Sequence, residues 1–423
     1  MSREMKDSGI PWIGKVPKSW TIELIGNQVK SVDNPNINGE EDNALQFKMG
    51  TIISKSKGDS KYNPETLEGY NIVDKGVIML NGLNLSFDFI SQRVGLVKEK
   101  GVITSTYLAV KPTQSIDSEY LTYLFKSYDN CKAFHGMGRG LRQTLSYGEL
   151  RKHLLIYPIL EEQQKIAKFL DKKCSEVDEM IALQEQIIEE LKAYKQSVIT
   201  EAVTKGLNPN VPMKDSGIEW IGEIPEHWEV KRLKYVSNIS RGLFNHRPRN
   251  DERYYGGIHP FIQTGDVARS NKYIKSYSQT LSDLGISVSK LFPKGTLTMT
   301  IAANVGDVSI LGFNAYFPDS VLGIIPVSGV DNIFLYYALK AMKGEFVNAA
   351  ILSTQLNLNV ERVYNMKAVM PPFSEQQQIA SYLDNKCPEI DYLIALKLAK
   401  IEELKEYKKS IIYEYVTGKK EVV

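Results

Sequence analysis

A duplicated stretch of 44 residues constrains this chain more than any other feature of its sequence. Residues 161–204 recur as residues 374–417, and an alignment without gaps keeps 26 of the 44 positions identical. A chain that repeats so long a segment is built from copies of one plan. We therefore expect the remainder of the sequence to divide into two comparable halves.

In each copy, mostly apolar residues recur at alternating steps of four and three positions, which would form a narrow seam along one side of a helix. This spacing is the heptad pattern of a coiled coil, so we predict that the two helices pair with one another. Two surface helices, each packed on its own domain, are the alternative. Gln184 and Lys397 occupy the same seam position as polar register residues. The predicted interface consists of Val177, Ile181, Ile188, Leu191 and Val198 with Ile390, Ile394, Ile401, Leu404 and Ile411.

The length of chain between the copies favours an antiparallel pair. A helix of about 30 residues is a rod of roughly 45 Å, and an antiparallel arrangement places the end of the first rod beside the start of the second. One compact domain can then connect the two points. Within each copy we also predict a break, because Ser175 suits an N-cap and Pro388 suits the first position of a new helix.

A second, shorter repeat marks the start of each half. Residues 6–20 match residues 214–228 at 10 of 15 positions, with turn residues between two tryptophans. We expect an ordered, extended segment that packs its rings against the end of the helix pair. A stacking platform for nucleobases, built from Trp12 and Trp20 or from Trp220 and Trp228, is the alternative.

The stretches between the repeats, 21–160 and 229–373, share a framework but differ in their loops. Short runs of β-branched residues are punctuated by glycine and followed by a helix, which predicts two copies of one α/β domain. The predicted fold is thus α/β, with two tandem domains separated by an antiparallel two-helix coiled coil and related by a pseudo-two-fold repeat. Two modules that perform the same task on different targets would share a framework and differ in their loops.

The sequence offers little evidence for catalysis. It lacks a GxxxxGK[ST] phosphate loop, and Met370-Pro371-Pro372-Phe373 lacks the Asn or Asp that precedes such a proline pair in amino-methyltransferases. The three cysteines and five histidines have no metal-ligand spacing. The polar start and the absence of an apolar run near ~18 residues argue against a secretory signal or a membrane span. We expect a non-catalytic, metal-free chain of the reducing cytoplasm.

Net charge is only +2, but basic residues with amides and hydroxyls gather in loops at matching places of the two halves. These groups contact phosphates and base edges in DNA complexes, although a solvated charged face would explain any single cluster. The candidate DNA-binding residues are Lys55, Lys57, Lys61, Arg139, Arg142 and Gln143 in the first half, and Arg241, Asn245, His246, Arg247, Arg249, Arg253, Arg269, Lys272, Gln355 and Asn357 in the second.

Three features together resemble the specificity subunits of bacterial type I restriction–modification systems. They are the duplicated KDSGI-x-WIG-x-x-P segment, the EQQ-x-IA-x-x-LD-x-K helix start at 162–173 and 375–386, and the charged helix after each. The likeness covers nearly the whole chain and is specific only in this combination.

The resemblance implies four parts: a target-recognition domain at 1–160, a helical spacer at 161–205, a second recognition domain at 206–373 and a second spacer at 374–423. Each recognition domain would read one half of a split double-stranded DNA sequence. The chain itself would bind no cofactor. S-adenosylmethionine, ATP and Mg²⁺ would belong to two modification subunits and to restriction subunits. A protein-interaction scaffold and a fused methyltransferase with an unrecognised active site stay open as other classes.

Overall fold

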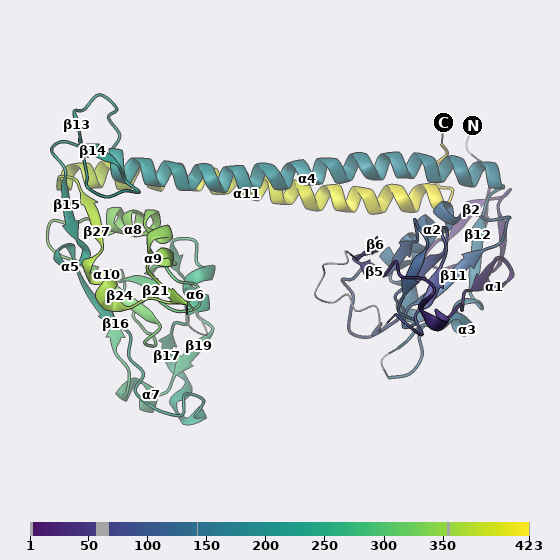
Figure 1. Cartoon of the computed structure of the whole chain (residues 1–423), viewed down its shortest axis with the longest axis horizontal. Helices are drawn as coiled ribbons and strands as arrows, with labels where there is room; N and C mark the ends of the chain where they lie inside the picture. Colours follow the sequence, from purple (N-terminus) through teal and green to yellow (C-terminus); the bar gives the residue numbers. More distant parts are fainter. Residues whose placement is uncertain (1–2, 56–66, 142, 353–355, 423) are drawn as a thin grey trace. The chain divides into compact units, whose positions relative to one another are not determined.

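The computed structural model describes residues 3–55, 67–141, 143–352 and 356–422 of the chain (Figure 1). These residues form two compact units. Unit 1 contains Met1–Glu185 together with Leu398–Val423, and unit 2 contains Gln186–Lys397. Two long helices, α4 (Leu160–Lys205) and α11 (Phe373–Val416), each contribute one segment to either unit.

Unit 1 is built on a four-stranded antiparallel sheet with the order β4-β11-β8-β9. Helix α2 begins where the Asp117 carboxylate accepts a hydrogen bond from the Tyr120 amide at 2.9 Å, a standard N-cap. The described elements of unit 1 that precede α4 are β1 (Met5–Asp7), β2 (Lys15–Pro17), β3 (Thr21–Leu24), α1 (Ile25–Gln28), β4 (Val29–Ser31), η1 (Ile37–Gly39), β5 (Leu45–Lys48), β6 (Thr51–Ser54), β7 (Asn71–Val73), β8 (Ile78–Leu80), β9 (Val94–Leu96), β10 (Gly101–Ile103), β11 (Leu108–Pro112), α2 (Ser118–Asn130), η3 (Ala133–Gly136), α3 (Tyr147–Leu150) and β12 (Leu154–Tyr157).

Unit 2 repeats this strand order as β16-β24-β21-β22 and adds β18 at the edge. Unit 2 also has a second sheet, β19-β17-β23-β20, whose order is not repeated among the described strands of unit 1. The elements of unit 2 are β13 (Met213–Asp215), β14 (Glu223–Pro225), β15 (Glu229–Arg232), α5 (Leu233–Val236), β16 (Ser237–Arg241), η4 (Glu252–Tyr254), β17 (Tyr255–Phe261), α6 (Thr264–Arg269), β18 (Tyr273–Ile274), β19 (Gln279–Leu281), α7 (Asp283–Ser287), β20 (Leu291–Phe292), β21 (Leu297–Thr300), β22 (Val308–Leu311), β23 (Ala315–Tyr316), β24 (Val321–Pro326), α8 (Asn332–Ala341), α9 (Lys343–Asn348), β25 (Ile351–Leu352), β26 (Leu356–Asn357), α10 (Val360–Asn365) and β27 (Lys367–Met370).

The predicted helix breaks at Ser175 and Pro388 are wrong, because α4 and α11 continue through both positions. Cys174 and Cys387 are buried one turn after Leu170 and Leu383, so the apolar stripe of each helix passes through the expected break. Ser175 donates a hydrogen bond to Glu179 within the helix instead of capping a new one. Tertiary burial therefore outweighs the local capping signals and the one backbone N–H that proline lacks.

Within each unit, the two helix segments run antiparallel. In unit 1 the Lys408 ammonium lies 2.6 Å from the Asp178 carboxylate, and the Phe169 and Tyr415 rings lie 4.4 Å apart. In unit 2 Lys195 makes the equivalent ion pair with Asp391, also at 2.6 Å. Of the ten predicted interface residues, seven are buried and three (Ile181, Leu191, Ile394) are half-buried.

One tryptophan of each opening segment packs at a helix end, as predicted. Trp20 is buried beside Gly418, which follows α11, and Trp228 is buried beside Gly206, which follows α4. Both glycines have positive φ, and a Cβ on either would lie about 3.0 Å from the neighbouring indole. The Trp228 indole also donates a hydrogen bond to Glu375 near the start of α11 at 3.0 Å. The interpretation as base-stacking platforms is therefore wrong for these two rings.

A matched polar cluster joins each module to its helix segments. Tyr123 on α2 donates a hydrogen bond to Asp171 at 2.6 Å, and Tyr337 on α8 donates one to Asp384 at 2.8 Å. Burial raises the pKa of the neighbouring thiols, Cys174 in unit 1 and Cys387 in unit 2, as expected for inert packing residues.

Candidate nucleic-acid interface

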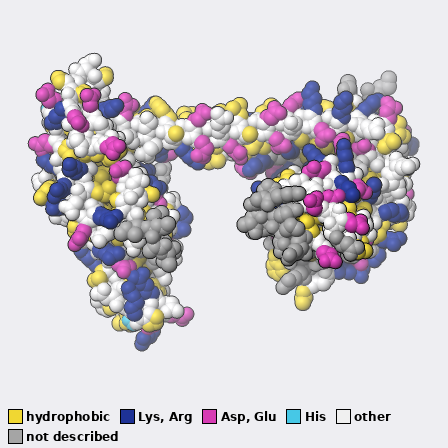
Figure 2. All heavy atoms as spheres, in the orientation of Figure 1, with side chains coloured by type: hydrophobic (Ala, Val, Ile, Leu, Met, Phe, Trp, Pro, Cys, Tyr) yellow, Lys and Arg dark blue, Asp and Glu magenta, His cyan; other side chains and the backbone are white. Residues whose placement is uncertain are grey.

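The loop between β16 and β17 in unit 2 carries the densest group of predicted DNA-binding residues. Its base is aromatic, since the buried ring of Phe244 contacts the rings of Tyr254, Tyr255 and Phe261 at 5.5–6.2 Å. Figure 2 shows Lys and Arg side chains gathered near the end of unit 2 that carries α7. The aromatic base fixes the backbone from which the arginines project.

Three arginines of this unit converge on Asp319. Arg249 donates to both carboxylate oxygens at 2.7 and 2.8 Å, and the Arg241 Nε donates to the Asp319 carbonyl at 2.6 Å. Arg247 lies 3.9 Å from the same carboxylate and donates to two loop carbonyls. The side chains of Arg247 and Arg249 stay about half exposed. Asp319 thus holds three guanidiniums in place, two beside its carboxylate and one at its carbonyl, and leaves an excess of positive charge at the surface.

Asp251 organises the other half of the loop. A hydrogen bond from Arg253, at 2.7 Å, is the main cause that lowers the pKa of the Asp251 carboxyl. His246 stacks on Tyr254 at 3.8 Å, and its Nε2 lies 3.2 Å from Asp251. The imidazole therefore helps to build the loop, whereas the Arg253 side chain is three-quarters exposed although it pairs with Asp251. Asn245 is exposed beside them.

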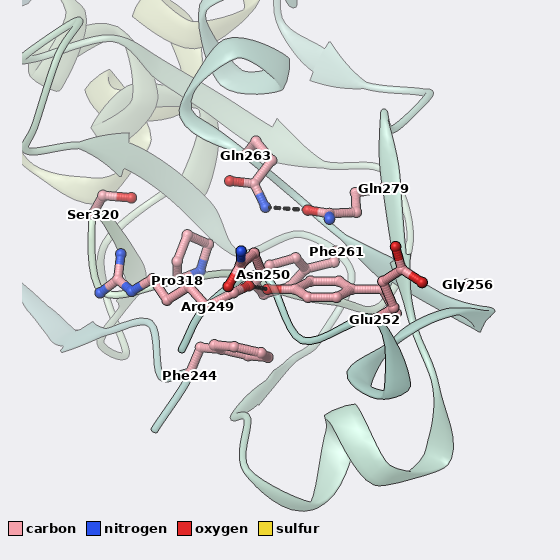
Figure 3. A pocket seen from close by; sticks show the side chains of 11 residues that line it. Phe244, Arg249, Asn250, Glu252, Gly256, Phe261, Gln263, Gln279, Pro318 and Ser320 are labelled. Carbon is pink, nitrogen blue, oxygen red and sulfur yellow. Dashed lines mark hydrogen bonds between the residues drawn. The ribbon is translucent and has the colours of Figure 1, made fainter. Parts of the chain in front are cut away.

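A cavity of about 660 Å³ lies between this loop, β17 and β19. Figure 3 shows the amides of Gln263 and Gln279 on one side of it, joined by a 2.9 Å hydrogen bond, with the Phe244 ring on the opposite side and Arg249 at the edge. Asn250, Glu252, Tyr255, Gly256, Phe261, Pro318 and Ser320 complete the lining. Amides, a hydroxyl and a guanidinium around aromatic rings can bind polar, planar groups such as base edges.

Lys272 and Arg269 lie elsewhere in unit 2. The Lys272 ammonium pairs with Asp384 on α11 and lies 5.2–5.8 Å from the rings of Tyr273, Tyr336 and Tyr337. It thus fastens the module to the helix, and we leave it out of the proposed DNA-contacting set. Arg269 is exposed and pairs with Asp266 at 2.6 Å on α6.

The candidates of unit 1 are more dispersed. Arg139 is three-quarters exposed and pairs with Glu149 at 3.1 Å. Its backbone exchanges hydrogen bonds with Thr144, which places Gln143, half-buried, in the same hairpin. Lys55 is half-buried after β6. Lys57, Lys61 and Arg142 of this half, and Gln355 of the other, lie outside the described residues, while Asn357 is exposed on β26.

Sequence reasoning missed Asp319, Gln279 and Ser320 as parts of this surface. Asp319 and Ser320 directly precede β24 in the sequence, but nothing local in the sequence shows that Asp319 binds Arg249 and Arg241, which lie 70 and 78 residues away. Among the described residues, no group of His, Cys, Asp and Glu could hold a metal ion. In the same part of the chain, no helix is both long and apolar enough for a membrane span.

Comparison with known proteins agrees with this architecture. The family model described as type I restriction modification DNA specificity domain matches residues 94–193 and 225–406. The type I restriction enzyme MjaVIII specificity subunit of Methanocaldococcus jannaschii is 25% identical over 96% of this chain and 94% of its own length. The EcoBI specificity subunit of Escherichia coli is 27% identical over 56% of this chain and 52% of its own length.

Solved structures share the fold. A chain from a type I R-M system, whose complex assembly and conformational transition were studied, aligns with a TM-score of 0.72 at 15% identity over 95% of this chain and 99% of its own. The HsdS subunit from Thermoanaerobacter tengcongensis aligns with a TM-score of 0.51 at 15% identity over 95% and 98%. The chain belongs to the type I restriction modification DNA specificity domain family and is a specificity subunit of such a system.

Proposed function

We propose that each unit reads one half of a bipartite, asymmetric DNA target. The observation that carries this proposal is one strand order in both units with unrelated loops upon it. Unit 2 presents the arginine-rich β16–β17 loop and its cavity, and unit 1 presents the Arg139 hairpin and the neighbouring loop at 81–93. A shared framework with different reading surfaces suits two half-sites of different sequence.

Helices α4 and α11 would act as an antiparallel coiled-coil spacer with pseudo-two-fold symmetry. Support comes from the equivalent ion pairs Asp178–Lys408 and Lys195–Asp391, one in each unit. Lys195 is only 15% exposed, so its charge needs the Asp391 carboxylate. Ion pairs at equivalent positions would fix the register of the two helices, and their length would then set the gap between half-sites.

The same helices offer docking surfaces for two modification subunits. Large apolar side chains are about half exposed at equivalent positions of the repeat: Met180 and Leu393, Leu183 and Leu396, and Tyr194 and Tyr407. Exposed apolar side chains that lie together mark sites of protein association, and each copy brings two of them within one helical turn, Met180 with Leu183 and Leu393 with Leu396. S-adenosylmethionine, ATP and Mg²⁺ would be bound by the modification and restriction subunits, and this chain would contribute recognition without catalysis.

Methylation mapping tests the proposal. Host DNA should carry methylated adenines at a split motif when this chain and its modification partner are both present, and should lack them when the gene for this chain is deleted. Replacing the unit 1 module, residues 21–157, by that of a relative should change one half of the motif only. Methylation at one continuous motif, or a swap that alters both halves, would contradict the bipartite reading.

A further inference from the structure

Unit 1 presents large apolar side chains on one loop, between the paired strands β8 and β9. Phe87 is 76% exposed and Ile90 is 87% exposed, and Leu141 from a neighbouring loop is 99% exposed. Exposed apolar residues are common singly, but three together on adjoining loops indicate a binding surface. We call residues 84–92 together with Leu141 the apolar finger.

The apolar finger is built on a buried arginine. The Arg93 side chain is 1% exposed, and its guanidinium donates hydrogen bonds to the carbonyls of Asn81, Leu83 and Asp88 at 2.9, 2.8 and 2.6 Å. The Arg93 amide in turn donates to the buried carboxylate of Asp129 on α2. A charged group bonded to three carbonyls of one loop fixes that loop from inside.

Further contacts, within the finger and with His135, make its backbone more rigid. The Asp88 carboxylate accepts hydrogen bonds from the amides of Ile90 and Ser91 at 3.1 and 3.0 Å, which forms a tight turn. The Phe89 ring stacks on His135 at 4.6 Å, and the His135 Nε2 lies 3.0 Å from the Asp88 carbonyl. Phe87 and Ile90 therefore project from a backbone that is already ordered.

The finger adjoins the hairpin that carries Arg139. Leu85 donates its amide hydrogen to the Gln143 carbonyl at 3.1 Å, and the Ser86 hydroxyl donates to the Leu141 carbonyl at 3.5 Å. In unit 2 the equivalent connection between β21 and β22 has seven residues, 301–307, whereas the connection in unit 1 has thirteen, 81–93. The valine of the shorter connection, Val305, is buried. The apolar finger thus belongs to unit 1 and to its reading surface.

We propose that the apolar finger inserts between adjacent base pairs of the half-site read by unit 1. This inference rests on the proposed function, and the occupant is double-stranded DNA because the finger is continuous with the Arg139 hairpin. Proteins that unstack a base step insert Phe, Leu or Ile side chains as wedges. A wedge must be stiff to separate stacked bases, and the buried Arg93 supplies that stiffness. Unit 2, which lacks the extra residues, would read its half-site without a wedge.

The test uses the full chain in complex with its modification subunits on a duplex that contains the mapped target. One base at a time in the first half-site is replaced by 2-aminopurine, whose fluorescence rises when it is unstacked. With the native chain we expect the 2-aminopurine fluorescence to rise at one position of the first half-site other than that of the methylated adenine. Phe87→Ala combined with Ile90→Ala should abolish that rise and weaken binding about ten-fold, the typical loss for one stacking contact. Leu141→Ala is the second variant, with the same direction expected.

Ile37→Ala is the matched control, because Ile37 is also an exposed apolar residue of unit 1 but lies outside the finger. It should leave both fluorescence and affinity unchanged. A fluorescence rise that persists in the finger variants, or no rise at any step in the native complex, would overturn the insertion. Variants that no longer retain the modification subunits would overturn it in favour of a protein-docking patch. If the native complex does not bind the split site at all, the proposed function fails instead.

Discussion

Asp319 determines which hydrogen-bond donors of the unit 2 arginines are still available to a ligand. One terminal nitrogen of Arg249 donates to both oxygens of this carboxylate, and one terminal nitrogen of Arg247 donates to two loop carbonyls. The other guanidinium nitrogens of Arg247 and Arg249 belong to side chains that are about half exposed, so they are the donors available to a ligand. These two residues are therefore held in place in the free chain, which would lower the entropy cost of the base contacts proposed for them.

Replacing Arg247 and Arg249 by Ala should relax recognition of one half-site and leave the other unchanged. Each bidentate base contact is worth about 1–3 kcal/mol of discrimination. The measurement is methylation mapping with each variant, with Lys231→Ala as control because Lys231 is an exposed lysine of the same unit on β15. Uniformly weaker binding with a shallower salt dependence would assign these arginines to phosphates. Equal relaxation of recognition at both half-sites would contradict the proposal that each unit reads its own half-site.

Asp88 gives a pH-dependent prediction for the apolar finger. Hydrogen bonds from the Ser91 backbone and side chain, together with the Ile90 amide and the nearby Arg93, lower the pKa of Asp88 to about 2. A carboxyl whose folded pKa lies below its unfolded value of about 3.9 stabilises the fold above that value and stops doing so as the pH falls towards 2. The melting temperature of the native chain should exceed that of Asp88→Asn at pH 6. The difference should shrink from about pH 4 downward, and a constant difference across that range would contradict the assignment.

At the scale of elements, the sequence predicted the features that recur in both halves of the chain. It missed those that depend on contacts with residues far away in the sequence. The duplicated segments located α4 and α11 because a heptad seam and its polar positions are local patterns, and the opening tryptophans were placed by recurrence. The helix breaks failed because Cys174 and Cys387 are buried against their modules, which no capping rule contains. Lys272 was grouped with the DNA-binding residues by local charge, whereas Asp384, its partner 112 residues away, holds it against α11.

Helix length should act as the ruler between the half-sites. Inserting four residues adds about one turn, or ~6 Å, to a helix. Insertions after Glu190 and after Glu403 keep the two helices matched, and they should widen the preferred gap by one or two base pairs at ~3.4 Å each. Methylation mapping of the double-insertion variant gives the gap directly. A single insertion is the control, because it shifts one seam against the other and should abolish activity. An active double variant with an unchanged gap would show that the helices do not set the spacing.

At the scale of the whole molecule, each unit is completed by the far end of the other half of the chain. Unit 1 takes in Leu398–Val423, and its first residues reach the last ones, since Arg3 pairs with Glu421 at 2.8 Å. The Lys419 ammonium also donates to the Ile13 carbonyl at 3.0 Å. Joining the old termini by a short linker and opening the chain near Asn208 should therefore preserve folding and the original methylation motif.

The same construction predicts that the fragment 1–208 folds as a homodimer. In the full chain Asp178 pairs with Lys408, and the repeat makes Lys195 the equivalent of Lys408. Two copies of the fragment can thus form two Asp178–Lys195 ion pairs across an isologous interface. Val198, Ile199 and Val203 would replace Ile411, Ile412 and Val416 against the first module, and Gly206 would replace Gly418 beside Trp20. The Phe169–Tyr415 ring contact is lost, because Ala202 stands at the equivalent position, so the dimer should be less stable than the full chain.

With its modification partner, this dimer should direct methylation to a palindrome made of two inverted copies of the first half-site. Sedimentation of the fragment measures its oligomeric state, and methylation mapping reads its target. Lys195→Asp provides the decisive variant, because it places like charges opposite Asp178 and should return the fragment to a monomer, whereas Lys192→Asp, at an exposed lysine outside the seam, should leave the dimer intact. A fragment that stays monomeric at tens of micromolar, together with an inactive circular permutant, would mean that the two helices do not pair in the antiparallel register proposed for them.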